Sequence, residues 1–229
     1  MYNGNLMQLK KQYNGFAKDY SHIIKKKARF SRRIFYNHFD FPLAGKKVLD
    51  AGCGDGTELL YCIKQKANAF GIDSSEGMVN LAKQNVPLAK VQVGDFAALP
   101  FPDRFFDIII SKHAMQSSAD VGQILEEFHR VLKPKGSLLY LSVHPLRQFM
   151  ERKKKKKDYF HKEKVESVLF GGLIKVMEPT HTFNEYLNPW FLKNFDIHEY
   201  EECFDPESAE KVEESSYPGF FIIKAQKRK

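Results

Sequence analysis

The chain of 229 residues has few cysteines and no long apolar run. Its three cysteines, Cys53, Cys62 and Cys203, form no CxxC pair and leave an odd count, which argues against a disulfide framework and against a cysteine-based zinc site. We expect no bound metal. No apolar segment opens the chain, and no stretch approaches the roughly 18 apolar residues of a membrane span. These absences favour a soluble, cytoplasmic protein without a membrane span.

Repeats and low-complexity sequence are also absent, apart from the run Lys153–Lys157. The composition, with 43% hydrophobic and 28% charged residues, is that of a globular protein, and the length suits one domain. The net charge of +8 invites a nucleic-acid or membrane-surface function. However, residues 1–44 carry +7, whereas residues 45–150 carry only +1. Residues 151–198 carry +3 and residues 199–229 carry −3, so the excess lies in the flanks.

Apolar runs alternate with amphipathic helical patterns along most of the chain. Short apolar runs predict strands at 48–51, 69–73, 91–93, 105–111, 137–143, 197–202 and 220–225. Helices are predicted at 57–66, 76–85 and 121–132, and also within residues 1–41. A capping box at Thr182 opens a further helix, which Pro189 either kinks or begins. Because helices separate the strands, we expect an α/β protein whose parallel sheet is covered on both faces.

A glycine-rich loop follows the first predicted strand and reads Asp50-Ala-Gly52-Cys-Gly54-Asp-Gly56. Glycine lets the backbone turn sharply and approach a ligand, and the helix that follows offers unpaired N–H groups. Asp73 ends the next strand 21 residues after Gly52, where a carboxylate can bind ribose hydroxyls. A tight turn without a ligand is the alternative. A dinucleotide site would read GxGxxG and its pyrophosphate would be repelled by Asp50, whereas a cationic sulfonium or ammonium cofactor would be attracted.

Four motifs occur in order over residues 47–143: VLDAGCGDGT, GIDSSEGMVNLAK, GDFAALPFPDRFFDIIIS and LEEFHRVLKPKGSLLYLS. They resemble the class I S-adenosylmethionine-dependent methyltransferases, and are most similar to the small-molecule branch that includes the ubiquinone and menaquinone biosynthesis enzymes. The resemblance implies a Rossmann-like fold with a mainly parallel seven-stranded sheet flanked by helices. It also implies S-adenosyl-L-methionine as the cofactor and S-adenosyl-L-homocysteine as its product.

The resemblance assigns cofactor-binding roles to individual residues. Asp50 would bind the amino group of the cofactor and Asp73 would accept hydrogen bonds from the ribose. The other expected contacts are Gly52, Cys53, Gly54 and Gly56 along the methionyl part, Ser74 and Met78 beside the adenine, Asp95 and Phe96 at the adenine amino group, Ser111 beneath the methionyl group, and Tyr20 at the carboxylate. The alternative roles are turn capping for Asp95 and ordinary helix packing for Met78.

Two histidines, His113 and His144, follow predicted strands at the edge where open α/β sheets bind ligands. Either one could assist as a base towards a phenol, an amine or an acidic carbon. A positioning or structural role is the alternative for both.

The sequence around the motifs suggests a covered acceptor site within one methyltransferase domain. Residues 146–180, basic and irregular to about residue 175, fall where such enzymes place substrate-covering elements. The expected parts are an N-terminal helical arm at 1–44, a cofactor-binding core at 45–145, this lid-like insertion, and a C-terminal helix and strands at 181–229 that complete the sheet.

The leading hypothesis is methyl transfer, by in-line displacement, to a small-molecule acceptor. Because the basic flanks would surround it, the acceptor is expected to be anionic more readily than cationic. A second hypothesis is an RNA or protein methyltransferase that docks through the arm and Lys153–Lys157, although the NPPY-type motif of many base-amino methyltransferases is missing and nucleic acid is not favoured. The third is a non-catalytic cofactor-binding or interaction protein, against which the intact loop, Asp73 and Asp95 argue.

Overall fold

A seven-stranded sheet forms the centre of the protein in a computed structural model, which describes residues 13–15, 29–152, 158–169, 174–206 and 216–229. The strands follow the spatial order β3-β2-β1-β4-β5-β9-β8. They are β1 (Lys47–Ala51), β2 (Asn68–Asp73), β3 (Lys90–Val93), β4 (Phe106–Lys112), β5 (Leu132–Val143), β8 (Phe195–Cys203) and β9 (Phe220–Lys227). Strands β1 to β5 pair in parallel, and β9 runs antiparallel to β5 and β8. The predicted mainly parallel seven-stranded sheet is confirmed.

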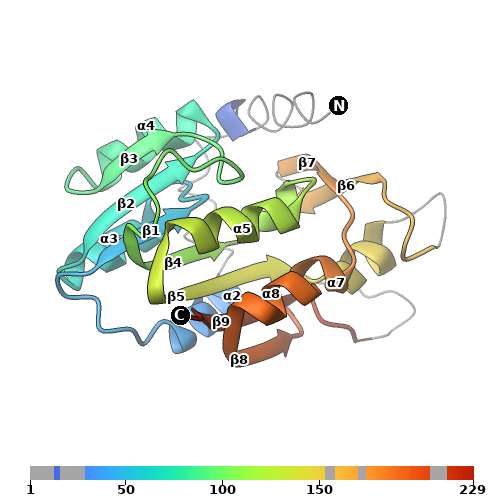
Figure 1. Ribbon diagram of the computed structural model, residues 1–229. Helices are drawn as coiled ribbons and strands as arrows, with labels where there is room; N and C mark the ends of the chain where they lie inside the picture. The colour runs from blue at the N-terminus through green and yellow to red at the C-terminus, as the bar shows by residue number, and fades with distance from the viewer. Residues whose placement is uncertain (1–12, 16–28, 153–157, 170–173, 207–215) are drawn as a thin grey trace.

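Helices cover both faces of this sheet (Figure 1). One face carries α2 (Arg29–His38), α3 (Thr57–Lys64) and α4 (Glu76–Asn85), and the other carries α5 (Val121–Val131), α7 (Phe183–Tyr186) and α8 (Pro189–Asn194). Val48 and Ile110 enter the first core, whereas their neighbours Leu49 and Ile109 enter the second. Successive side chains of a strand point to opposite faces, so burial on both sides explains the uninterrupted apolar runs of the central strands.

Two element boundaries differ from the sequence prediction for local backbone reasons. Helix α3 ends at Lys64 because Lys66, at φ 62°, is left-handed and cannot continue the helix. Strand β5 begins earlier than predicted because Leu132 already pairs with Phe106 of β4. Between Leu132 and Ser137 the pairing with β4 is irregular, and Lys135 is left-handed at φ 60°.

The capping signals in the C-terminal part are confirmed. The Glu185 carboxylate accepts a hydrogen bond from the Thr182 N–H at 3.0 Å, which completes the capping box of α7. Pro189 begins α8 instead of kinking α7, because Asn188 Oδ1 accepts from the Phe191 N–H at 2.8 Å and starts a new helix.

A hairpin lies in the segment that was expected to be irregular. Strands β6 (Lys164–Leu169) and β7 (Ile174–Pro179) pair antiparallel as a separate two-stranded sheet (Figure 1). The expectation of irregular chain to about residue 175 is therefore wrong here, because Val165 and Val176 are buried while charged neighbours face outwards. Helix α6 (Pro145–Arg147) and a π-helical turn (Gln148–Arg152) precede the hairpin. The run Lys153–Lys157 lies outside the described residues.

Helix α2 is fixed to the sheet by both apolar and charged contacts. Phe35 and Phe39 are buried in the core. The two ring nitrogens of His38 contact the carboxylates of Glu199 and Glu201 on β8. Since a carboxylate only accepts, both nitrogens donate and the ring carries both protons. In the described ranges, no helix has the length and apolar character that crossing a membrane requires.

Candidate functional site

The loop after β1 carries three glycines in left-handed backbone conformations. Their φ angles are 81° at Gly52, 51° at Gly54 and 83° at Gly56, which a residue with a Cβ adopts only at a cost. A Cβ on Gly52 would also lie 2.3 Å from the Cβ of Ala114, which follows β4, and 3.6 Å from a ring carbon of Phe96, which follows β3. The carboxyl ends of β1, β3 and β4 therefore converge on Gly52.

Asp50, in β1, is a buried carboxylate beside this loop. Its Oδ2 atom is inaccessible and has no hydrogen-bond partner among the described residues. Burial and the nearby Glu58 raise the pKa of Asp50 well above its ordinary value, while Lys112 acts in the opposite direction. Lys112 itself forms an ion pair with Glu58. Because a buried acceptor without a donor is costly, Asp50 is suited to a cationic N–H donor from a ligand.

Asp73 stands at the end of β2 and holds the glycine loop in place. Its Oδ2 accepts a hydrogen bond from the Gly54 N–H at 3.0 Å, and its Oδ1 accepts from the Ser75 N–H at 2.9 Å. Burial raises the pKa of Asp73, although the hydrogen bonds from these N–H groups lower it in part. Each carboxylate oxygen can accept a second hydrogen bond, so Asp73 can bind ribose hydroxyls while it holds the loop.

The first turn of α4 lies next to Asp73. Ser75 caps this helix, its Oγ accepting from the Met78 N–H at 3.2 Å. From the arm, Asn14 Oδ1 accepts from the Ser75 hydroxyl at 2.7 Å and from the Gly77 N–H at 2.9 Å. Met78 is buried and Ser74 half-buried. The two residues expected beside the adenine thus lie where the arm meets α4, whereas Tyr20 lies outside the described residues.

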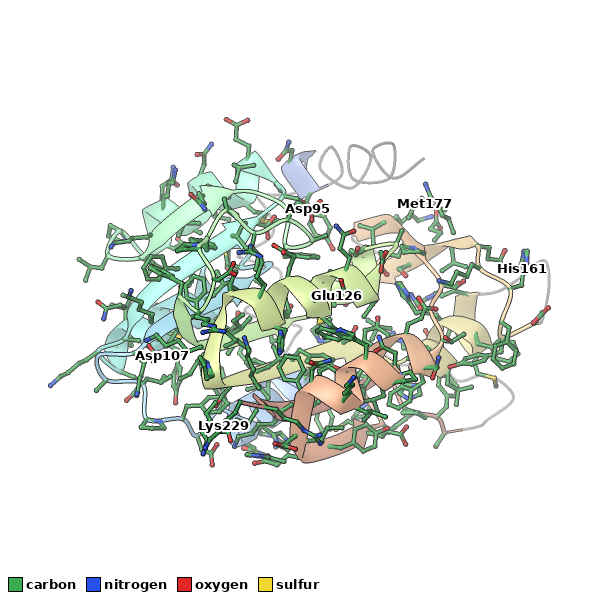
Figure 2. All side chains as sticks on the ribbon, viewed as in Figure 1. Asp95, Asp107, Glu126, His161, Met177 and Lys229 are labelled. Carbon is green, nitrogen blue, oxygen red and sulfur yellow. The ribbon has the colours of Figure 1, made fainter. Side chains whose placement is uncertain are left out.

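Asp95 lies in the loop after β3 (Figure 2). Its Oδ1 accepts from the Ala97 N–H at 2.9 Å, so it caps a turn. Its carboxylate has a second oxygen, and turn capping therefore does not conflict with a contact to adenine. Phe96, the next residue, brings its ring towards Gly52.

Ser111 joins the ends of β4 and β1, because its hydroxyl donates to the Ala51 carbonyl at 2.8 Å. Cys53 is buried in the loop, and burial together with Asp50 raises the pKa of its thiol well above the ordinary value. The thiol therefore stays protonated. Within the described ranges, no group of three or more His, Cys, Asp or Glu side chains is arranged to hold a metal ion.

Comparison with known sequences agrees with this geometry. Residues 49–140 match the methyltransferase domain family. The chain carries a class I S-adenosylmethionine-dependent methyltransferase domain. Malonyl-[acyl-carrier protein] O-methyltransferase 1 of Coxiella burnetii is 41% identical over 100 residues, which are 43% of this chain and 34% of that protein. The demethylmenaquinone methyltransferase of Symbiobacterium thermophilum is 35% identical over 108 residues, 43% of this chain and of that protein. The chain thus spans less than half the length of these two relatives.

Solved structures share the fold of this chain. An S-adenosylmethionine-dependent methyltransferase from Mesorhizobium loti superposes with a TM-score of 0.66 at 21% identity, covering 81% of this chain and 93% of that chain. The expected family and its cofactor, S-adenosylmethionine, are confirmed. The methionyl end of this cofactor carries an ammonium, a carboxylate and a sulfonium. The buried Oδ2 of Asp50 fits the cationic groups.

Arg32, on α2, is a second polar side chain with buried, unpartnered atoms; the sequence had suggested it only as part of the basic docking surface of the arm, and not as a cofactor contact. Its Nε and Nη2 atoms are buried and have no partner among the described residues. Arg32 lies one turn before Tyr36 on the same helix. Burial and the charge of Glu58 raise the pKa of the Tyr36 hydroxyl, and the charges of Arg32 and Asp50 also act on it. A guanidinium fits a carboxylate. The sequence carries no signal that distinguishes Arg32 from Arg33, its exposed neighbour on the same helix.

The two candidate histidines have different surroundings. His113 is left-handed, at φ 53°, and its Nε2 lies 3.2 Å from the Ser31 hydroxyl of α2. Burial, together with the charges of Lys112 and Arg147, lowers the pKa of His113 to about 3, so its ring is neutral at ordinary pH.

His144 instead caps α6, where its Nδ1 accepts from the Leu146 N–H at 3.1 Å. Its Nε2 donates to Glu202 at 3.0 Å, and its ring stacks on Phe183. With both nitrogens engaged, these contacts favour a structural role for His144.

Proposed function

We propose that this protein transfers the methyl group of S-adenosylmethionine to a small-molecule acceptor. The observation that carries the proposal is a set of buried atoms on side chains of opposite charge, Asp50 Oδ2 and Arg32 Nε and Nη2, which have no partner in the described structure. Asp50 would accept from the cofactor ammonium and Arg32 would donate to its carboxylate. Paired in this way, each group regains the hydrogen bonds that burial denies it.

The rest of the cofactor would follow the carboxyl edge of the sheet. Asp73 would accept from the ribose hydroxyls through its remaining acceptor capacity. Ser74 and Met78 would flank the adenine, and Asp95 would accept from its amino group, with Phe96 as apolar cover. Gly52, Cys53, Gly54, Gly56 and Ser111 would line the methionyl part. Tyr20 stays a prediction from the sequence.

The bound cofactor supplies an electrophilic methyl group on a sulfonium. The residues of this chain need to hold the acceptor in line with that methyl group and to exclude water. His113 lies on the turn whose Ala114 reaches Gly52, and Ser31 and Phe220 contact its ring. A neutral imidazole can accept a hydrogen bond from a hydroxyl or an amine. Since a pKa of about 3 makes His113 a weak base, we propose that it orients the acceptor.

An anionic acceptor suits the charges near His113. Lys112, which pairs with Glu58, and Arg147, which pairs with Glu151, both act on the His113 ring. A carboxylate placed there would be attracted and would need no base, because its oxygen is already deprotonated. Two of the relatives are named for the methylation of malonyl-[acyl-carrier protein] and of demethylmenaquinone. The RNA alternative depends on Lys153–Lys157, outside the described residues, and stays a prediction from the sequence.

Cofactor binding and labelled-methyl transfer test this proposal together. Thermal unfolding of the purified protein should shift upwards with S-adenosylmethionine and with S-adenosylhomocysteine, since a ligand that binds only the folded state stabilises it. Incubation of metabolite extracts with methyl-labelled cofactor should then yield a labelled small molecule. An absence of any shift at millimolar ligand would refute cofactor binding. Binding without transfer to any extract would favour the non-catalytic alternative.

A further inference from the structure

Gln116 is the centre of the buried hydrogen bonds behind His113. It lies in the 3-10 turn Met115–Ser117, which follows β4, and it is buried. Its Nε2 donates to the His113 carbonyl at 2.8 Å, and its Oε1 accepts from the Ser142 hydroxyl at 3.3 Å. These two contacts fix the orientation of the amide, because a flipped amide would place its oxygen against the His113 carbonyl.

The left-handed backbone of His113 requires this support. A non-glycine residue at φ 53° persists only where its surroundings hold it, and such residues concentrate at functional sites. The His113 N–H donates to the Leu141 carbonyl at 2.8 Å, and the His113 carbonyl accepts from Gln116. Both peptide groups of His113 are thereby held. In this conformation the ring reaches the Ser31 hydroxyl and meets the Phe220 ring edge-on.

Gln116 is also bonded to the chain that follows the hairpin. Its backbone carbonyl accepts from His181 Nε2 at 3.0 Å, and His181 Nδ1 lies 3.1 Å from the Glu185 carboxylate. The His181 N–H in turn donates to Gln148 Oε1 at 3.2 Å. The segments on either side of the hairpin are thus held to the same glutamine as His113.

We infer that Gln116 is a positioning residue for methyl transfer. Its side chain holds His113 in the conformation that presents the imidazole to the acceptor. Its backbone carbonyl accepts a hydrogen bond from His181, which follows the β6–β7 hairpin, and so connects this turn to the hairpin. The inference rests on the proposed function, in which His113 faces the acceptor. The hydrogen bonds of Gln116 described above go to His113, Ser142 and His181 and not to the glycine loop, so its removal should leave cofactor affinity within about twofold of wild type.

The test compares two glutamine-to-leucine variants by the titration of His113. Gln116→Leu keeps the approximate volume and removes both amide contacts. Gln123→Leu is the matched control, because Gln123 donates in the same way to a loop carbonyl, that of Ala97 at 3.1 Å. Histidine-selective NMR from about pH 3 to pH 8, assigned with His113→Ala, follows the ring.

The wild-type ring should stay neutral over most of this range, since burial and the facing cations Lys112 and Arg147 lower the pKa of His113 to about 3. Gln116→Leu should move the midpoint towards the ordinary value of about 6.5, because the released ring regains water. Gln123→Leu should leave the midpoint unchanged. A glutamine that serves only packing would change the unfolding temperature and leave the His113 midpoint where it was.

An unchanged midpoint in folded Gln116→Leu would overturn the inference, and so would a wild-type midpoint near 6.5. If Gln116→Leu does not fold, Gln116→Met gives the same readout, because this change also removes both amide contacts and adds no charge beside His113. S-adenosylhomocysteine affinity, measured on the same samples, separates the two proposals. A wild-type protein that does not bind this ligand contradicts the proposed function, whereas binding with an unmoved His113 contradicts the positioning role alone.

Discussion

Replacement of Arg32 by methionine tests whether this buried side chain binds the cofactor. The Nε and Nη2 atoms of Arg32 are buried and lack a partner in the described structure. Burying a polar group without its hydrogen bonds costs about 1–3 kcal/mol, and a charged group costs more. Arg32→Met keeps an unbranched apolar stem and removes this cost. The cofactor-free variant should therefore be at least as stable as wild type, although its affinity for the cofactor falls.

The expected loss of affinity follows from the contacts that Arg32 would make. A hydrogen bond to a charged group contributes about 1.5–3 kcal/mol. Wild type should therefore bind S-adenosylmethionine about 10- to 150-fold more tightly than its decarboxylated form, which retains the sulfonium and the amine. Arg32→Met should bind the two ligands with similar affinity. Isothermal titration calorimetry measures the preference, and thermal unfolding without ligand measures the stability.

Arg33→Gln is the matched control, because Arg33 is the next residue of α2 and is exposed. It should leave the ligand preference unchanged. Two results would refute the reasoning. A cofactor-free Arg32→Met protein that unfolds at a clearly lower temperature would show that Arg32 stabilises the fold through contacts of its own. A retained preference for the carboxylate would assign that group to another residue, with Tyr20 as the candidate from the sequence.

Three further changes test the loop and α2. Gly52→Ala should lower the free energy of unfolding by about 2–5 kcal/mol, measured in urea, because φ is 81° and the new Cβ would lie 2.3 Å from Ala114 Cβ. Asp73→Ala should weaken S-adenosylhomocysteine binding by roughly 10- to 100-fold in calorimetry, through lost ribose contacts and a loosened loop. Burial alone would lower the pKa of His38, but its two glutamate partners raise it. Its contribution to stability should therefore be full below about pH 6.5 and be lost as pH rises through the raised pKa, a dependence that His38→Gln removes in urea unfolding at several pH values.

These changes have controls within the same elements. Gly45 is left-handed at φ 73° with nothing within 4 Å of an added Cβ, so Gly45→Ala should cost only the backbone term of about 1–2 kcal/mol. An equal cost at the two glycines would show that the Ala114 contact is not limiting. Unchanged ligand affinity in Asp73→Ala would remove this carboxylate from the site. A wild-type pH slope in His38→Gln would exclude His38 as the titrating group.

The glycine loop and its carboxylates could be predicted because local chain geometry places them together. Asp50, Gly52 and Gly56 belong to one strand–loop–helix unit, and Asp73 ends the strand that pairs directly with β1. In a parallel sheet the carboxyl ends of neighbouring strands meet at one edge, so spacing along the chain becomes proximity in space. The central strands could be predicted for a similar reason, since burial on both faces leaves an uninterrupted apolar run.

Residues that act across long sequence separations could not be found in this way. Arg32 and Gln116 owe their positions to the packing of α2 and of the hairpin segment, and periodicity does not describe that packing. For His144, by contrast, the neighbouring sequence did contain a signal for its structural role. A histidine directly before Pro145 is a helix start with proline at its first position, and the structure places it as the cap of α6. The strand end alone had suggested a catalytic position.

The proposed role of Arg32 offers a physical explanation for part of the charge of the basic arm. The carboxylates of Asp50, Asp55, Glu58 and Asp73 lie close together at the carboxyl edge of the sheet. Besides burial, the charges of Glu58, Asp73 and Asp55 raise the pKa of Asp50. The charge of Arg32, on α2, acts on the Tyr36 hydroxyl together with those of Glu58 and Asp50. An acidic pocket attracts a sulfonium and an ammonium but repels the carboxylate of the same cofactor. In the proposed site, Arg32 from the arm would remove that conflict, and the cofactor would then account for part of the net positive charge of residues 1–44 without reference to a nucleic acid.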